Sequence, residues 1–304
     1  MLYDGDKFTI REVPNVPTQF ACSHILPQAD GRIWFVQEYG TNVDIFNPAD
    51  ETWSPLADLP CEYCAPFVYD AEGKLWAGSD LGLFIIEDRR ATQLTTEHGL
   101  PANLVTSIAF APDGHVWVGT DAGVAHIEGE TVTAIFNSET AGFSDNRIYS
   151  ILAASDGSMW VGNETGLSRM LLDGSWVHYT PGDPFQGEVR INDIAEDSNG
   201  AIWLATRGEG VYRFASDRWQ QFLPTDPGVQ LANPEVNCIT VAPDGSLWFG
   251  TYYSGAARFD GSEWQAFDVS PDAGLINWNV NDIYVDDSGA TWFATSGGVT
   301  RFRP

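Results

Sequence analysis

Three arginines are the side chains of this chain best suited to bind an anionic ligand. The 304 residues include 15 Lys and Arg against 42 Asp and Glu, which gives a net charge of −27. Because a guanidinium group can grip a carboxylate or sulfate with two hydrogen bonds, Arg147, Arg190 and Arg207 are candidates for a local cationic pocket. The alternative is that they neutralise nearby acidic residues: Glu164, Glu188 and Glu209.

Aromatic and polar side chains could complete a site for a small polar molecule. Tyr252, Tyr253 and Trp278 offer flat faces on which a sugar or an aromatic ring can stack, although aromatic residues in loops also pack without a ligand. Glu38 and His24 are further candidates, and a histidine beside a carboxylate can act as a general base. We expect these residues, like the three arginines, to take part in ligand binding.

One repeated position carries an asparagine in three copies: Asn192, Asn237 and Asn281. Asparagine side chains often hydrogen-bond backbone groups, and that is one interpretation. Together with Asp193 and Asp282 they could instead hold an ordered water or a Ca²⁺-like ion. We expect no cofactor and assign no metal ligand or catalytic residue, with a divalent cation in the central channel as the alternative.

The cysteines leave the redox compartment open, because four cysteines in a chain of this length do not form a disulfide-dense framework. Cys61 and Cys64 have CxxC spacing, which alone is weak evidence for zinc because a structural zinc site needs four ligands. Cys22 and Cys64 share one repeat position and could form a disulfide. We expect them instead to be small buried residues.

A repeat of 41 to 45 residues positions all of these side chains. A Gly lies three residues before each repeated Trp, and an apolar residue lies nine before it. The repeated tryptophans are Trp34, Trp76, Trp117, Trp160, Trp203, Trp248 and Trp292. A period of this length with four short strands per copy is typical of a propeller blade.

The repeat predicts an all-β fold, a seven-bladed β-propeller with four antiparallel strands per blade, as a single domain over residues 1–304. The tryptophans are expected to fill the space between neighbouring sheets. A repeated arginine at the end of the third strand is expected to pair with an acid of its own or the next blade. These arginines are Arg169, Arg213, Arg258 and Arg301.

The N-terminal segment is expected to close the last blade. The seventh copy stops at Pro304 before a fourth strand, and residues 3–8 mirror residues 259–264 at the start of an earlier fourth strand. We therefore predict that residues 1–13 supply the outer strand of the blade that begins at about residue 280, which removes an open sheet edge.

The repeat resembles that of the two-component-regulator propeller family. The residues that carry this resemblance are 105–120, 191–214 and 280–302. The resemblance implies a periplasmic or extracellular ligand-sensing propeller of a bacterial hybrid histidine kinase, with other domains in a larger native chain. No signal peptide is evident in residues 1–5.

The repeats are secondarily similar to streptogramin-lyase-type propellers, which use a His two residues before the repeated Ile and a Glu three after the Trp. In this chain the first position is occupied by Ser23, Ala65, Thr106, Tyr149, Asn192, Asn237 and Asn281. The second is occupied by Gln37, Ser79, Thr120, Asn163, Thr206, Thr251 and Thr295. The lyase chemistry is therefore not expected.

The charge argues against two classes of partner. A surface this acidic repels phosphate backbones and anionic lipids, so we expect no nucleic-acid partner and no membrane-surface partner. The chain has no apolar run of about 18 residues that could span a bilayer.

The leading hypothesis is a non-enzymatic sensor that binds a saccharide or a small polar or anionic molecule over the central channel. We expect the site at the loop end of the blades, where each first strand begins, because the turn end carries short, similar turns with little room. One alternative is a hydrolase or lyase with carboxylates at the channel mouth. Those carboxylates would be Glu38, Glu62, Glu164, Glu209, Asp193 or Asp282. A protein-docking scaffold is the other alternative.

Deleting residues 1–13 should lower the stability of the whole domain. The deletion would remove one strand of the closing blade and leave the edge of its third strand bare, at a cost of about 3 kcal/mol or more. Thermal unfolding of the truncated and full chains tests this. An unchanged melting temperature would refute the proposed closure.

Overall fold

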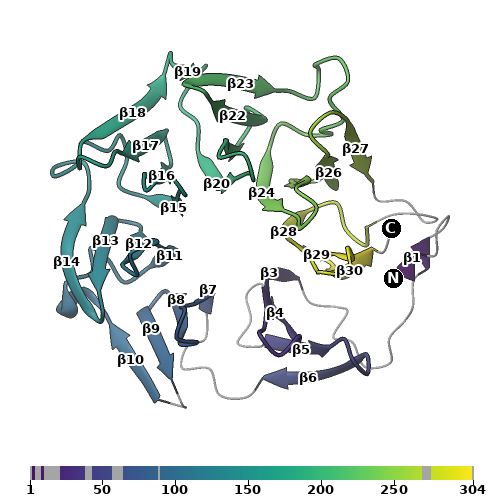
Figure 1. The fold of residues 1–304 in the computed structure, drawn as a ribbon, viewed down its shortest axis with the longest axis horizontal. Coiled ribbons are helices and arrows are strands. Elements are labelled where there is room, and N and C mark those ends of the chain that lie inside the picture. The colour runs from purple at the N-terminus through teal and green to yellow at the C-terminus, as the bar shows by residue number, and fades with distance from the viewer. Residues whose placement is uncertain are drawn as a thin grey trace. The chain divides into compact units, whose positions relative to one another are not determined.

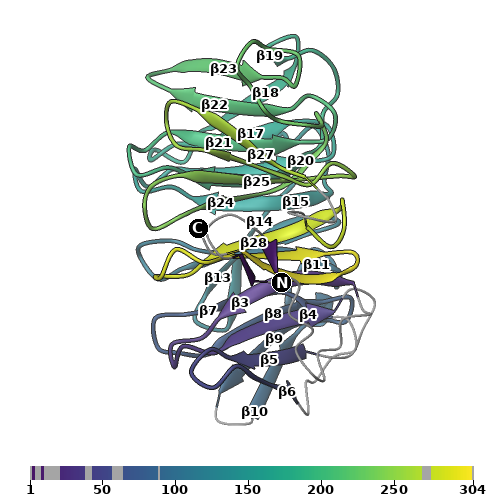
Figure 2. The same cartoon turned by 90° about the vertical axis from the view of Figure 1, so that its right-hand side faces the viewer.

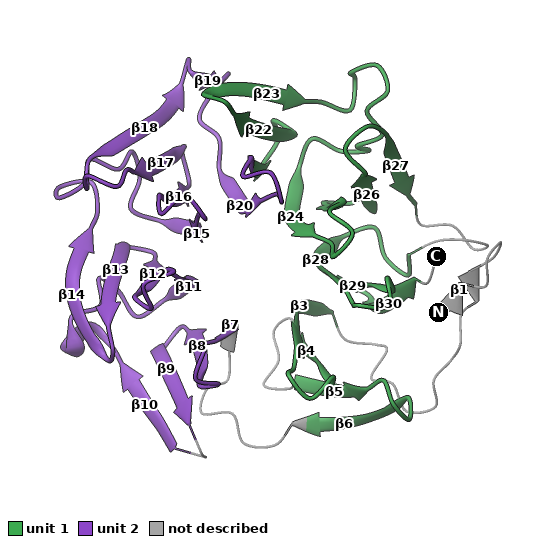
Figure 3. Cartoon of the chain, viewed as in Figure 1, with its two compact units in different colours: residues 1–58, 203–304 green, residues 59–202 purple. Residues whose placement is uncertain are grey.

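The computed structural model describes residues 2–3, 8–9, 21–37, 43–56, 64–87, 90–268 and 275–302. These residues form β-strands joined by turns, with one short 3-10 helix, η1 (Thr96–His98). The strands make seven blades of a seven-bladed β-propeller, which confirms the predicted fold class (Figure 1). The chain divides into two compact units at residues 58/59 and 202/203, the latter at the start of a second strand (Figure 3).

Unit 1 comprises residues 1–58 and 203–304. Its first blade has the order β3 (Cys22–Pro27), β4 (Ile33–Gln37), β5 (Val43–Asn47), β6 (Thr52–Leu56), and both views show these strands in sequence across the sheet (Figure 1, Figure 2). It also holds β22 (Val211–Ala215) and β23 (Arg218–Phe222), with β21 (Ile202–Thr206) at its boundary. The next blade is β24 (Val236–Val241), β25 (Leu247–Thr251), β26 (Ala256–Phe259) and β27 (Trp264–Phe267). The last is β28 (Val280–Val285), β29 (Thr291–Thr295) and β30 (Gly298–Phe302).

Unit 2 comprises residues 59–202. One blade contains β7 (Cys64–Tyr69), β8 (Leu75–Ser79), β9 (Gly82–Glu87) and β10 (Arg90–Leu94). The next contains β11 (Val105–Phe110), β12 (Val116–Thr120), β13 (Gly123–Glu128) and β14 (Thr131–Phe136). The third contains β15 (Ile148–Ala153), β16 (Met159–Asn163), β17 (Leu167–Met170) and β18 (Trp176–Pro181), extended by β19 (Pro184–Phe185). The unit ends with β20 (Ile191–Glu196), a first strand.

The N-terminal closing strand lies mostly outside the described residues. β1 (Leu2–Tyr3) pairs with β2 (Phe8–Thr9), and β1 lies against β30 of the last blade. Residues 4–7 and 10–13 are not described. The closure by residues 1–13 therefore stays a prediction.

The repeated tryptophans pack between neighbouring blades, as the sequence predicted. Trp292 of β29 contacts Phe35 and Phe46 of the first blade, with ring centroids 5.6 and 5.0 Å apart. Trp248 of β25 contacts Phe293 of the last blade at 5.6 Å. Six of the seven side chains are buried and Trp34 is half-buried. Large apolar rings thus fill the space between these neighbouring sheets.

The repeated arginines lie over these tryptophans and pair with acids, which confirms their predicted structural role. The distances from guanidinium carbon to Trp ring centroid are 4.8 Å for Arg169, 5.6 Å for Arg213, 6.0 Å for Arg258 and 4.5 Å for Arg301. Three of these side chains also reach a turn carboxylate: Arg169–Asp156 at 2.7 Å, Arg258–Asp244 at 2.9 Å and Arg301–Asp286 at 3.7 Å. The cation is thus held between an aromatic face and a carboxylate.

A histidine is enclosed in the first strand of the first blade. His24 lies on β3 opposite Val36, and its Nδ1 atom is buried without a hydrogen-bond partner among the described residues. Burial lowers the pKa of His24 from 6.5 to about 4, because the charged imidazolium is poorly solvated there. The ring is therefore neutral at neutral pH.

Replacing Arg169 by methionine should destabilise the fold by about 1–2 kcal/mol, since it removes both the contact with Trp160 and the ion pair with Asp156. Arg218→Met is the matched control, because that arginine is exposed on β23, and it should cost less than about 0.5 kcal/mol. Urea unfolding measures both. Equal losses would show that the repeated arginine has no special role.

Stability should fall on acidification through His24. Between pH 6.5 and about 4 the unfolded chain binds a proton that the folded chain does not, so stability is lost as pH falls through this window. A difference of this size corresponds to a few kcal/mol, about 3 at most. We expect His24→Gln to flatten the dependence of urea unfolding on pH in that window. An identical pH dependence in both proteins would contradict the enclosure of the ring.

Candidate functional site

The first strands of five blades share a β-bulge that sets the direction of one side chain in each of them. The pairing with the second strand shifts between Cys22 and His24, Val105 and Ser107, Ile148 and Ser150, Val236 and Cys238, and Val280 and Asp282. The residues at the bulge are Ser23, Thr106, Tyr149, Asn237 and Asn281. Bulges re-aim side chains and recur near functional sites, so this position is the natural place to look for ligand contacts.

Two of the candidate arginines meet at one such residue in unit 2. Arg190, just before β20, lies over the ring of Tyr149 on β15, with the guanidinium carbon 4.6 Å from the ring centroid. Its Nε donates a 2.7 Å hydrogen bond to Oδ1 of Asn192. The Tyr149 hydroxyl donates to the carboxylate of Glu164. We call these four residues, with Arg147, the Tyr149 cluster.

Arg147 completes the Tyr149 cluster from the loop before β15. Its backbone N–H donates to Asp145 Oδ1 at 2.7 Å, and its side chain is exposed. A hydrogen bond with Tyr149, reinforced by the charge of Glu164, raises the pKa of the Arg147 guanidinium above its ordinary value. The cluster therefore presents two guanidinium groups beside one carboxylate at the loop end of the blade.

The third arginine belongs to a separate group in unit 1. Arg207 Nε lies 3.3 Å from Glu235 Oε1, and the two residues form an isolated β-bridge. The carbonyl of Glu235 accepts a 3.0 Å hydrogen bond from Tyr252 N. The rings of Tyr252 and Tyr253 lie 4.0 Å apart, and a hydrogen bond between them raises the pKa of Tyr252. We call these four residues the Tyr252 cluster.

Two aromatic candidates of unit 1 are open to solvent. Tyr253 is 61% exposed and has a φ of 60°, a left-handed conformation that is strained for a tyrosine and is found disproportionately at binding sites. Trp278 is 49% exposed. Its carbonyl accepts a 2.8 Å hydrogen bond from Gly255 N, which anchors it to the loop after Tyr253.

The alternative that these arginines neutralise nearby acids is met by one of them, with a partner other than the acids named from the sequence. Arg207 pairs with Glu235, whereas the Glu209 carboxylate accepts a 2.6 Å hydrogen bond from the Tyr212 hydroxyl. Glu164 is bound through Tyr149. The arginines are thus distributed between two clusters, with Arg147 and Arg190 in unit 2 and Arg207 in unit 1.

The repeated asparagines of unit 1 join first strands of neighbouring blades. Asn237 Nδ2 donates to Val280 O at 2.9 Å and to Asn279 Oδ1 at 3.0 Å. Asn281 Nδ2 donates to Cys22 O at 2.8 Å. These amides serve backbone groups, which is the first of the two roles that the sequence left open.

The aspartates beside them serve the same purpose. The two carboxylate oxygens of Asp282 accept 2.8 Å hydrogen bonds from the backbone of Ile25 and of Ile283. Asp193 Oδ1 accepts a 2.8 Å bond from Ile194 N. Carboxylates committed to backbone donors in this way have fewer lone pairs for a cation.

The remaining sequence candidates either lie apart from the two clusters or lie outside the described residues. His24 is enclosed and neutral, as described above. Glu38, Glu62 and Cys61 lie outside the described residues, as does the Cys64 side chain. Cys22 and Cys238 are buried thiols, as expected for small core residues.

The repeat position three residues after the Trp, which carries a Glu in the lyases, has a structural role in this chain. The Ser or Thr hydroxyl at this position donates to the carbonyl of the glycine that opens the third strand, at 2.7–2.9 Å. The pairs are Ser79 with Gly82, Thr120 with Gly123, Thr206 with Gly210, Thr251 with Gly255 and Thr295 with Gly298. Each hydroxyl caps a tight connection.

A cavity at the turn end corrects the expectation that short turns leave little room there. A cavity of 590 Å³ lies between the blades β24–β27 and β28–β30 of unit 1. Asp244, Arg258, Asp286 and Phe302 are among its lining residues. The charged residues of its lining include the arginine–aspartate pair that covers Trp248. The structural role of that pair explains why charged side chains line the cavity.

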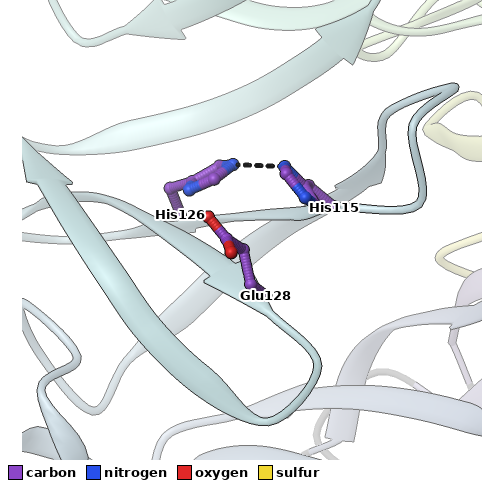
Figure 4. A group of neighbouring side chains, drawn as sticks. All are labelled: His115, His126 and Glu128. Atoms are coloured by element: carbon purple, nitrogen blue, oxygen red, sulfur yellow. Dashed lines mark hydrogen bonds between the residues drawn. The ribbon is translucent and has the colours of Figure 1, made fainter.

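Sequence reasoning missed a group of side chains at the turn end of the blade β11–β14. Two histidines and a glutamate, His115, His126 and Glu128, lie together there (Figure 4). They are separated by 11 and 2 positions in the sequence. The signal that could have found them is the predicted hairpin, which places His126 opposite Trp117, two residues after His115.

None of the helical segments in the described part of the chain is long and apolar enough to cross a membrane. No curated protein sequence matches the chain. The model of the family described as "Two component regulator propeller" matches residues 99–122, 142–165, 186–208 and 230–253.

Solved structures with similar folds are of two kinds. The extracellular domain described as that of the hybrid two component system BT4673 from B. thetaiotaomicron has a TM-score of 0.77 and 20% identity, over 95% of this chain and 39% of that one. The corresponding domain of BT3049 from the same organism has a TM-score of 0.77 and 22% identity, over 94% and 39%. Virginiamycin B lyase from Staphylococcus aureus has a TM-score of 0.72 and 15% identity, over 94% and 95%.

These likenesses show the fold, and the chain spans about two-fifths of the length of the two sensor domains. In each of four blades, the matched segment covers the loop before the first strand, the first strand and the second strand. The matched segments include all residues of the Tyr149 cluster and of the Tyr252 cluster. The comparisons thus show that four segments of this seven-bladed β-propeller match the two-component-regulator propeller repeat.

Proposed function

We propose that the chain is the ligand-binding propeller of an extracellular sensor and that it binds a small anionic or acidic saccharide-like molecule at the Tyr149 cluster. The observation that carries this proposal is the meeting of Arg147 and Arg190 at one tyrosine. In a chain with a net charge of −27, two guanidinium groups at one loop end create a local reversal of potential. The larger native protein would contain further domains that transmit the signal.

The chemistry of the Tyr149 cluster suits an anion better than a neutral ligand. Arg190 is oriented by the Tyr149 ring below it and by Asn192 beside it, so little side-chain entropy remains to be lost on binding. Arg147 is exposed and can move toward a ligand. A carboxylate or sulfate could accept charge-assisted hydrogen bonds from both guanidinium groups.

The Tyr252 cluster is the second place where a ligand could be held. Its exposed Tyr253, together with Trp278, offers stacking surfaces of the kind that bind sugar rings. Because Arg207 already pairs with Glu235, this cluster is nearer to neutrality and suits an uncharged saccharide. We place the anionic site at the Tyr149 cluster and treat the Tyr252 cluster as its comparison.

The hydrolase or lyase alternative would need carboxylates available for proton transfer. Glu209 is bonded to Tyr212, and both oxygens of Asp282 are bonded to backbone N–H groups. Glu164 is bonded to Tyr149. With these three carboxylates engaged in hydrogen bonds, binding accounts for the geometry of the described residues better than catalysis does. No contact among the described residues favours a docking scaffold.

Replacing Arg147 or Arg190 by alanine should weaken binding of an anionic ligand by about tenfold or more each, since a charge-assisted hydrogen bond contributes about 1.5–3 kcal/mol. Isothermal titration of the full chain against a panel of uronic acids, sulfated sugars, neutral oligosaccharides and small acids would identify the ligand. Arg218→Ala, an exposed arginine on β23, is the matched control and should leave affinity unchanged.

The same panel separates the two clusters. If Arg147→Ala and Arg190→Ala leave affinity unchanged while Trp278→Ala lowers it, the ligand is bound in unit 1 and the anionic site is wrong. If no panel member binds but one is turned over, the sensor proposal itself is wrong.

A further inference from the structure

The residue opposite the repeated tryptophan differs among the blades: it is an isoleucine in β3–β6 and β7–β10, and a histidine in β11–β14. In three blades the residue paired with the Trp is an arginine: Trp160 with Arg169, Trp248 with Arg258 and Trp292 with Arg301. In the blade β11–β14 the residue paired with Trp117 is His126. Its ring meets the Trp117 ring edge-on, with centroids 4.9 Å apart.

The blade β11–β14 contains the aspartate that binds this arginine in other blades. Asp113 lies four residues before Trp117, the same offset that Asp156 and Asp244 have from their tryptophans. In those two blades the aspartate binds the arginine of the third strand. In this blade Asp113 Oδ2 lies 3.4 Å from His115 Nδ1 instead.

The imidazole groups of His115 and His126 face each other. His126 Nε2 lies 3.2 Å from His115 Nδ1 (Figure 4). Glu128 follows His126 by two residues on β13, so both side chains project from one side of the strand. One atom each of His115, His126 and Glu128 lies within 4.8 Å of the others, close enough to share one ion.

We propose that His115, His126 and Glu128 bind a divalent transition-metal ion of the zinc class. Two imidazole nitrogens bound to one tetrahedral zinc at 2.0–2.1 Å are about 3.3 Å apart, which matches the 3.2 Å between His126 Nε2 and His115 Nδ1. Imidazole with carboxylate favours zinc, copper or nickel, whereas Ca²⁺ and Mg²⁺ prefer all-oxygen sites. The ion takes over the positive charge that arginine provides beside Trp160, Trp248 and Trp292.

A hydrogen bond from the fourth strand prepares His126 for this role. Thr133 Oγ1 lies 2.8 Å from His126 Nδ1 and donates its own proton to His126 O at 3.3 Å. The hydroxyl therefore accepts from Nδ1–H, which leaves the Nε2 lone pair directed at His115. Such second contacts orient metal-bound histidines. Thr133 can reach the ring because β14 has a bulge there, where the pairing shifts between His126 and Ile127.

Two carboxylates can complete the donor set around the histidine pair. Glu128 is exposed and can close on the ion. Asp113 Oδ2 lies 3.4 Å from His115 Nδ1 and is positioned to serve as a fourth ligand.

Titration calorimetry of zinc into the full, chelator-treated chain tests the site. We expect one ion per chain in the wild type and a loss of at least tenfold in affinity in His126→Gln and in His115→Gln. Glu128→Gln should weaken binding by a smaller factor. Thr133→Val should lower affinity by about tenfold through the orientation of His126. His178→Gln, which alters a histidine on the neighbouring blade, is the matched control and should bind as the wild type does.

Thermal unfolding supplies a second measurement. Zinc should raise the melting temperature of the wild type and of His178→Gln, because an ion that binds the folded chain stabilises it. It should leave His126→Gln unchanged, while the metal-free variants should melt close to the metal-free wild type. Failure of the wild type to bind zinc, or binding of several ions that both histidine variants retain, would overturn the proposal.

Discussion

The contact between each repeated tryptophan and the next sheet is the constraint on which the rest of the structure depends. A four-stranded blade cannot bury its own faces, so it must pack against a neighbour, and the Trp fills the widening space between them. Trp292 does this against Phe35 and Phe46, and Trp248 does it against Phe293. Burial of about 200 Å² per ring corresponds to about 5 kcal/mol by area. The blades are therefore rigid supports for their loops.

Charge is arranged around the same tryptophans. Arg169, Arg258 and Arg301 lie between a Trp ring and a turn aspartate. In a chain with only 15 basic residues, this leaves few cations for the loops. Two of them meet at Tyr149, and the blade β11–β14 carries a histidine where the following blade carries Arg169. Both proposed binding sites thus lie at positions where the side chains depart from the repeat, while the strands that carry them keep the repeated structure.

Several structural contacts could be predicted from the sequence because they repeat. The spacing of Trp and Gly indicated the blades, and the recurring arginine indicated an ion pair with an acid. The ligand-binding candidates Arg147 and Arg190 were also recognisable as cations in an acidic chain. Tyr149 was not singled out, because its meeting with Arg190 depends on a β-bulge in one strand and a loop before another.

The sequence by itself determined the fold class, the number of blades and the buried positions, because these follow from local periodicity of apolar and turn-forming residues. Only the tertiary structure decided which polar side chains meet. His115 and His126 are 11 residues apart, yet pairing of β12 with β13 brings their nitrogens within 3.2 Å. Such encounters depend on the pairing of particular strands and on bulges that redirect one side chain, and a bulge leaves no periodic signal in the sequence.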